Sequence, residues 1–130
     1  MARGYTVATA ALALRVPAKW LDNALSHNQV TGVLQARQGV PRRLSVDGLL
    51  IIGLALWLTI DFAIPLPTAI AVAEKLVSTQ GEYNSDHGVK IKVDLEGFRR
   101  ELLTRLDHAV EVAPLPRRGR PPKNRTGRLE

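Results

Sequence analysis

The sequence predicts a mainly α-helical fold followed by a basic tail. Two observations predict it: apolar residues recur at helical spacing in several segments, and the 17 residues 114–130 hold four prolines and six bases. A chain of 130 residues fits one domain with room for a tail. The absence of cysteine excludes disulfides and thiolate metal sites, and it is typical of a reducing cytosol.

Two short helices are predicted near the N-terminus. Thr6 can cap the first of them, and Pro17 suits the first turn of the second, because its missing N–H costs nothing there. Apolar side chains gather on one face of each helix: Val7, Ala10, Ala11 and Leu14 in the first, and Val16, Trp20, Leu21, Ala24 and Leu25 in the second. Two short helices joined by a tight turn form a helix-turn-helix unit.

A β-hairpin is predicted after these helices. Val30–Leu34 and Val40–Leu44 are compatible with short strands, and Gly39 suits the turn between them. Pro41 places its strand at a sheet edge, because proline has no N–H to donate. We expect this hairpin to form a wing beside the helix-turn-helix unit.

Two further helices follow the hairpin. Ser45 can cap a helix that is apolar on nearly every face from Leu49 to Ile60, as expected of a helix buried all round or shared with a partner. The prolines of the segment 64–67 end it. A fourth helix is predicted from Pro67 to Val77.

The remainder of the chain predicts a loop, a strand and a final helix. Residues 80–88 are typical of a loop, and residues 89–93 alternate as in a half-buried strand. That strand needs a partner, which can be the wing, residues 5–7 or its twin in a second protomer. The final helix, Leu95–Val112, either forms a contact in a dimer or packs over the third helix of its own chain. Its apolar stripe consists of Leu95, Phe98, Leu102, Leu106 and Ala109.

Charge is segregated along the chain. The net charge of +6 divides into +5 on residues 1–46, −4 on residues 47–113 and +5 on residues 114–130. Proteins that bind polyanions concentrate positive charge where they touch phosphate. Two basic ends around an acidic middle therefore indicate a nucleic-acid binder.

The tail contains Pro116-Arg117-Arg118-Gly119-Arg120-Pro121-Pro122-Lys123, which resembles an AT-hook. The resemblance implies binding in the narrow minor groove of A·T-rich DNA, where the negative potential is deepest. Gly119 lets the backbone approach the groove floor, and the adjacent arginines extend along it. The alternative is a generic basic tail that only adds solubility. The tail is expected to be disordered in the free protein. The implied contacts are Arg117, Arg118, Gly119, Arg120, Pro121 and Lys123.

The order helix, turn, helix and basic wing, followed by Arg42-Arg43-Leu44-Ser45-Val46-Asp47-Gly48-Leu49, resembles the winged helix-turn-helix of MerR-like regulators. The resemblance implies a winged domain over residues 1–79, a strand and helix for packing or dimerisation over 80–113, and the AT-hook tail over 114–130. Arg15 stands where the family usually has glycine, and no cysteine effector site exists. The chain is thus most similar to the small, ligand-free, excisionase-like members.

The outer face of the second helix carries the candidate base contacts. Lys19 can bond guanine and Asn23 can bond adenine in the major groove. Alternatively, both side chains only belong to the solvent-exposed face of the helix and contact no DNA. The other candidates on this helix are Ala18, Asp22 and Ser26. Phosphate contacts are expected from the wing residues Arg37, Gln38, Arg42 and Arg43.

These observations predict a sequence-specific regulator of transcription, acting as a homodimer on double-stranded DNA in the cytoplasm, on the nucleoid. The alternatives are an architectural or DNA-segregation protein and an antitoxin-like protein-interaction module. The sequence lacks a cysteine nucleophile, a glycine-rich phosphate loop and a carboxylate cluster, so we expect no enzyme and no cofactor, metal or small-molecule ligand. The uncharged, largely apolar run of 13 residues between Asp47 and Asp61 is shorter than the roughly 20 residues that span a membrane.

Overall fold

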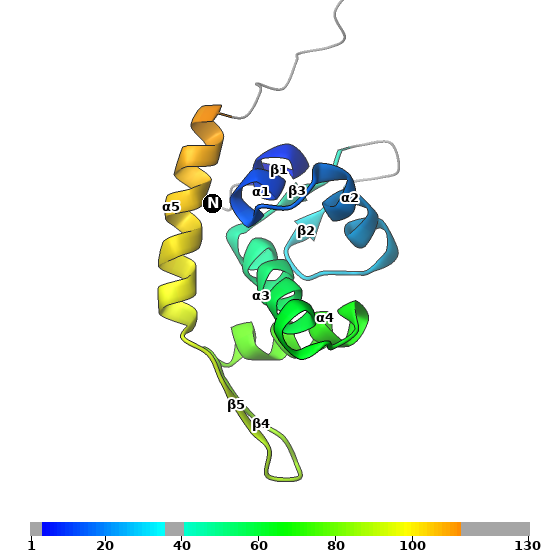
Figure 1. The fold of residues 1–130 in the computed structure, drawn as a ribbon, viewed down its shortest axis with the longest axis vertical. Coiled ribbons are helices and arrows are strands. Elements are labelled where there is room, and N and C mark those ends of the chain that lie inside the picture. The colour runs from blue at the N-terminus through cyan, green and yellow to red at the C-terminus, as the bar shows by residue number, and fades with distance from the viewer. Residues whose placement is uncertain (1–3, 36–40, 113–130) are drawn as a thin grey trace, which may run out of the picture.

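The computed structural model describes residues 4–35 and 41–112, and side chains to residue 110. Five helices dominate it, which confirms the mainly α prediction (Figure 1). The elements in order are β1 Tyr5–Thr6, α1 Val7–Leu14, α2 Ala18–His27, β2 Val33–Leu34, β3 Arg43–Leu44, α3 Val46–Phe62, α4 Leu66–Ser78, β4 Glu82–Asn84, β5 Lys90–Lys92 and α5 Leu95–Val112. None of the helices in these ranges is long and apolar enough to cross a membrane.

Helix α1 begins and ends at residues with clear local roles. The Thr6 hydroxyl accepts a hydrogen bond from the Thr9 N–H over 3.1 Å, as the predicted cap requires. Arg15 ends the helix with φ 63°, in the left-handed region that favours glycine. This conformation costs a non-glycine residue about 1–2 kcal/mol, so glycine would suit this position better. Pro17 then directly precedes α2.

The two predicted wing strands pair as an antiparallel hairpin, β2 with β3. They are shorter than predicted, and β1 adds a third strand on the other side of β3, with Tyr5 opposite Leu44. Strand β3 is therefore central, and the prediction that Pro41 places its strand at a sheet edge was wrong. Pro41 lies two residues before the paired residues Arg43 and Leu44, so its missing N–H does not interrupt the pairing. Gly32 shapes the turn into β2 with φ 90°. A Cβ there would lie 2.6 Å from the Gly48 backbone nitrogen, so this turn touches the start of α3.

Helices α3 and α4 form the centre of the core. Ser45 caps α3 as predicted, its hydroxyl accepting from the Gly48 N–H over 3.1 Å. Residues from Gly48 to Ala55 are buried on all sides, which confirms burial as predicted for most of this helix. The predicted break lies before α4, which begins at Leu66, one residue earlier than expected.

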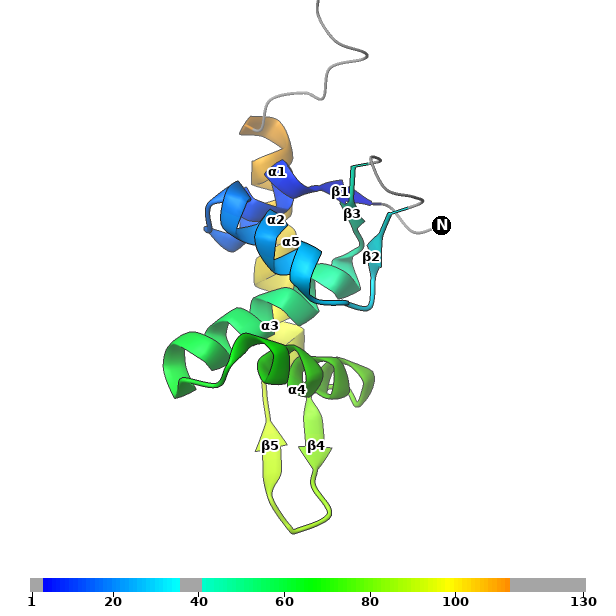
Figure 2. The ribbon, with the colours of Figure 1, turned by 90° about the vertical axis from the view of Figure 1, so that its right-hand side faces the viewer.

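The prediction of a loop over residues 80–88 was wrong for residues 82–84 and is confirmed for residues 80–81 and 85–88. Residues 82–84 form β4 and pair antiparallel with β5, with Tyr83 opposite Ile91. The Ser85 hydroxyl accepts from the N–H groups of His87 and Val89 and so closes the turn. The partner of the strand predicted at 89–93 is therefore β4, rather than the wing or residues 5–7. This hairpin projects from the helical body (Figure 2).

Helix α5 packs within its own chain. Leu95, Leu102, Leu106 and Ala109 of its apolar stripe are at most 5% exposed. The stripe lies mainly along α1, and less along α3, the helix that the in-chain alternative named as its neighbour. A Cβ on Gly53 of α3 would lie 3.0 Å from the Phe98 ring, so the missing side chain admits α5. The in-chain alternative for this stripe is thus the one observed.

Candidate nucleic-acid interface

The outer face of α2 is exposed to solvent, as its amphipathic pattern predicted. Leu21, Ala24 and Leu25 are buried, and Trp20 packs against the core. The candidate base contacts are all exposed: Ala18, Lys19, Asp22, Asn23 and Ser26. Because the body of the protein holds only the inner face, the outer face is available to a second molecule.

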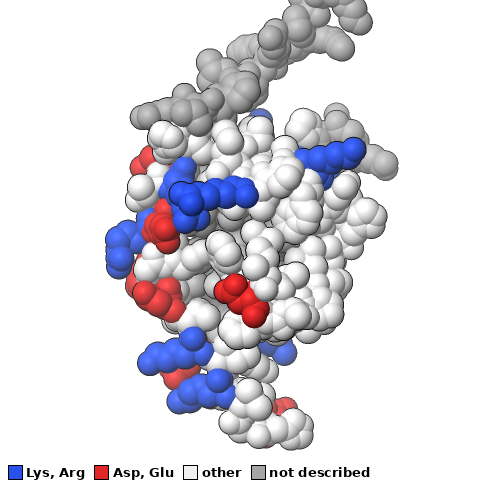
Figure 3. All heavy atoms as spheres, viewed as in Figure 1, with Lys and Arg blue, Asp and Glu red and all other residues white. Residues whose placement is uncertain are grey.

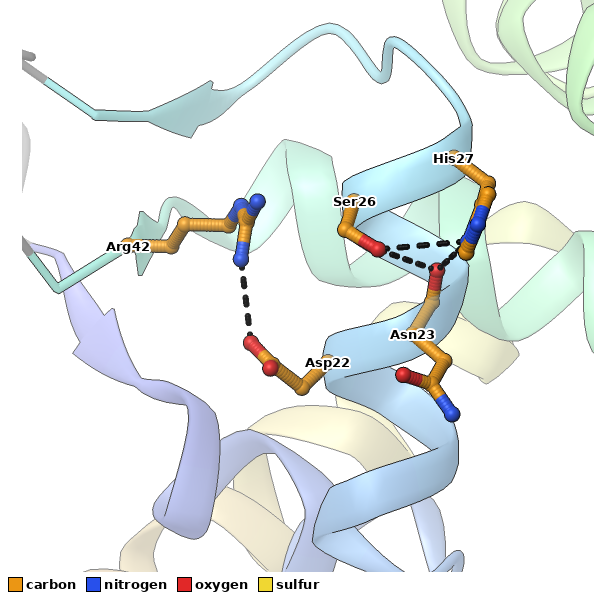
Figure 4. A network of polar contacts seen from close by, with 5 residues as sticks. All are labelled: Asp22, Asn23, Ser26, His27 and Arg42. Carbon is orange, nitrogen blue, oxygen red and sulfur yellow. Dashed lines mark hydrogen bonds and ion pairs between the residues drawn. The ribbon is translucent and has the colours of Figure 1, made fainter. Parts of the chain in front are cut away.

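Hydrogen bonds fix the C-terminal end of this face (Figure 4). The Ser26 hydroxyl donates to the Asn23 carbonyl oxygen over 2.9 Å, and His27 Nδ1 lies 2.8 Å from the same oxygen. Since a carbonyl oxygen only accepts, the contact is a hydrogen bond in the tautomer of His27 that carries the proton on Nδ1. Asn28 donates from its side chain to the Ala24 carbonyl over 2.9 Å. The hydrogen bond to Asn23 therefore already uses the hydroxyl proton of Ser26 within its own helix.

The two arginines before and in β3 have different surroundings. Arg42 reaches α2 and forms an ion pair with Asp22, with 3.0 Å between Nη1 and Oδ1. Arg43 lies over Gly4, where a Cβ would be only 2.7 Å from the Arg43 Cβ. The structure therefore brings Arg42, rather than Arg43, to the outer face of α2. The predicted phosphate contacts Arg37 and Gln38 lie outside the described residues.

Two open grooves flank α2, and Arg42 lines both of them. The first, of about 450 Å³, lies between α2 and the start of α1. The second, of about 420 Å³, lies between the end of α2 and β2. Their linings include Thr6, Ala18, Lys19 and Asp22 in the first, and Ser26, His27, Asn28 and Val33 in the second. The Arg42 side chain thus forms a ridge between them.

The described residues are nearly neutral as a set. Residues 113–130 contribute +5 to the net charge of +6, and Arg3 and Arg37 contribute +1 each, which leaves −1 on the described residues. Positive and negative side chains alternate along α5, and much of the face to its right is uncharged (Figure 3). Most of the net positive charge therefore lies in the segments outside the described part, including the residues that resemble an AT-hook.

One end of α3 is exposed rather than buried. Trp57 and Ile60, one helical turn apart, are 42% and 59% exposed, and Phe62 is 70% exposed. A few exposed apolar residues are normal on a protein surface. Two aromatic side chains at the end of an otherwise buried helix nevertheless mark a candidate contact surface.

Among the described residues, no three His, Cys, Asp or Glu side chains lie together as metal ligands would. No protein-family model matches the chain, and no curated protein or solved structure is significantly similar to it.

Proposed function

We propose that this chain is a sequence-specific regulator of transcription that binds double-stranded DNA. In this proposal the chain is a MerR-like, excisionase-like winged helix-turn-helix protein that acts in the cytoplasm, on the nucleoid. Helix α2 lies in the major groove, and the β2–β3 hairpin is the wing that contacts the DNA backbone. The observation that carries the proposal is the free polar face of α2 beside that hairpin. An α-helix fits the major groove, where the base pairs are distinguishable.

The tail supplies the second contact in this proposal. Replacing Arg118 and Arg120 with alanine is expected to weaken binding mainly at sites flanked by A·T runs, because both arginines extend along the minor-groove floor. The same change should flatten the salt dependence, since fewer phosphates are neutralised. Fluorescence anisotropy with labelled duplexes, with and without A·T flanks, at several salt concentrations measures both effects.

A matched control removes the same charge from the tail outside the AT-hook core. The Arg125→Ala, Arg128→Ala variant is expected to lower the salt slope similarly without changing the preference for A·T flanks. Equal effects of the two double variants on every duplex would contradict a minor-groove role for the core. Failure of the unmodified chain to bind any duplex at low salt would contradict the proposed function itself.

The proposed protein acts as a homodimer on two half-sites, as helix-turn-helix proteins commonly do. With the α5 stripe and the 89–93 strand satisfied within the chain, we assign the contact to the exposed end of α3. The exposed surface of three side chains at this end, Trp57, Ile60 and Phe62, is on the order of 350 Å². Each partner in a stable protein–protein interface buries about 800 Å². The three side chains can therefore form the apolar centre of such an interface.

Replacing Trp57 and Ile60 with serine is expected to shift a dimer to monomers, because the apolar centre of the contact is lost. Light scattering after size-exclusion chromatography measures the mass, with Val110→Ser on α5, where Val110 is 52% exposed, as the control. If the double variant remains a dimer, this end of α3 is not the dimer contact. Purification from the native host with another protein in equal amounts would instead favour the antitoxin-like alternative.

A further inference from the structure

The ion pair between Asp22 and Arg42 stands at an unexpected place. Asp22 is the only acidic residue among the first 46 residues, yet it lies on the outer face of α2 with its side chain 57% exposed. Arg42, which binds it over 3.0 Å, is 21% exposed (Figure 4). An exposed ion pair contributes little to the free energy of folding. Stability alone therefore does not account for an acid here.

The pair lies inside the candidate interface rather than at its edge. Arg42 lines the grooves on both sides of α2, and Asp22 lines one of them together with Lys19. Along the helix, Asp22 is one turn from Lys19 and Ser26. Whatever enters the groove between α2 and the start of α1 therefore meets the Asp22 carboxylate.

A carboxylate is selective among the groups that DNA presents. Phosphate oxygens and the acceptors N7, O6 and O4 of the bases repel it, whereas the amino groups of cytosine and adenine can donate to it. The known preference of aspartate and glutamate in the major groove is for the cytosine N4 amino group. Oδ1 of Asp22 binds Arg42, and its other oxygen makes no hydrogen bond within the described residues.

We propose that Asp22 is a specificity-determining residue, which accepts a hydrogen bond from the N4 amino group of one cytosine in the DNA site. Arg42 positions the carboxylate and neutralises it, and Asp22 in turn keeps Arg42 from binding phosphate on unmatched DNA. This inference rests on the proposed function, because it requires α2 to enter the major groove. The inference goes beyond the proposed function because it names the base that is read and the charged group that distinguishes it from other bases.

The test compares Asp22→Asn with Glu101→Gln in the full chain. Glu101 and Arg105 form a closely similar ion pair on α5, 2.9 Å apart with side chains 61% and 24% exposed. Both variants lose one negative charge, but only Asp22→Asn changes the outer face of α2. Each protein selects sites from a random duplex pool, and anisotropy then measures affinity for the selected site, for the same site with the cytosine pair replaced, and for random DNA.

For the unmodified chain, we expect replacement of the cytosine pair to weaken binding about tenfold or more. Asp22→Asn should lose most of this preference, bind random DNA more tightly and raise the salt slope by about one, because Arg42 is freed for phosphate. Arg42→Gln should weaken binding to every duplex, since the carboxylate then meets phosphate without a counterion.

The outcomes separate this inference from the proposed function. If Asp22→Asn and Glu101→Gln bind DNA with the same base preference and the same salt slope, the assignment of Asp22 is overturned while the proposed function stands. If the unmodified chain binds no duplex, the proposed function fails and takes this assignment with it.

Discussion

Replacing Lys19 and Asn23 with alanine is expected to weaken binding to the specific DNA site by about 1–3 kcal/mol for each residue. On random duplex the loss should be small, because non-specific binding depends on phosphate contacts. Both side chains are exposed, and neither makes a hydrogen bond or ion pair with the described part of the chain. The fold should therefore survive the change, and anisotropy on the selected site and on random DNA measures the difference.

Arg100→Ala provides the matched control for this prediction. Arg100 is an exposed cation on α5, away from α2, so its loss removes one charge without touching the proposed reading face. Equal losses on the specific site and on random DNA for the Lys19 and Asn23 variants would show that these residues do not read the sequence. They would then be the solvated helix face of the alternative interpretation.

The second large effect is expected at Leu106 in α5. Its side chain is 0% exposed and belongs to the core that joins α5 to the rest of the chain. Leu106→Ala should lower the free energy of unfolding by about 2–5 kcal/mol, because it removes buried methyl groups and leaves a cavity. Urea denaturation followed by circular dichroism measures this change.

Leu103 on the same helix supplies the comparison. It is 39% exposed, so Leu103→Ala should change the free energy of unfolding by no more than about 0.5 kcal/mol. Similar small effects of both substitutions would mean that α5 does not pack on its own chain in solution. A concentration-dependent effect of Leu106→Ala would instead place this stripe in a dimer.

The helices were predictable because their signals are local. Thr6 and Ser45 cap their helices through hydrogen bonds to residues only three positions ahead. Apolar spacing also identified the buried face of α2 and the stripe of α5, since a helix repeats within a few residues. The exposed candidate contacts on α2 follow from the same periodicity.

The sheets were less predictable because pairing depends on residues far apart in the chain. Strand β1 has two residues and pairs with β3 nearly 40 positions away. Strand β4, Glu82–Asn84, has no apolar alternation of its own and becomes a strand through β5 and the Ser85 turn. Short polar segments of this kind carry no periodic signal.

The central feature of the candidate site was also hidden from the sequence. Asp22 and Arg42 were each predicted as a DNA contact, but their separation of 20 positions gave no reason to pair them. Their meeting depends on how the hairpin sits beside α2, which is set by tertiary packing. The segment that resembles an AT-hook is the opposite case: the sequence alone predicts its contact residues, and they lie outside the described residues.

The most direct test of the account follows backbone amide chemical shifts by NMR while the full chain is titrated with duplex DNA. We expect the shifts to concentrate in α2, at the base of the β2–β3 hairpin and in the tail, with little change at the β4–β5 hairpin. Changes confined to the exposed end of α3 or to β4–β5, or none at all, would contradict a DNA-binding face built on α2.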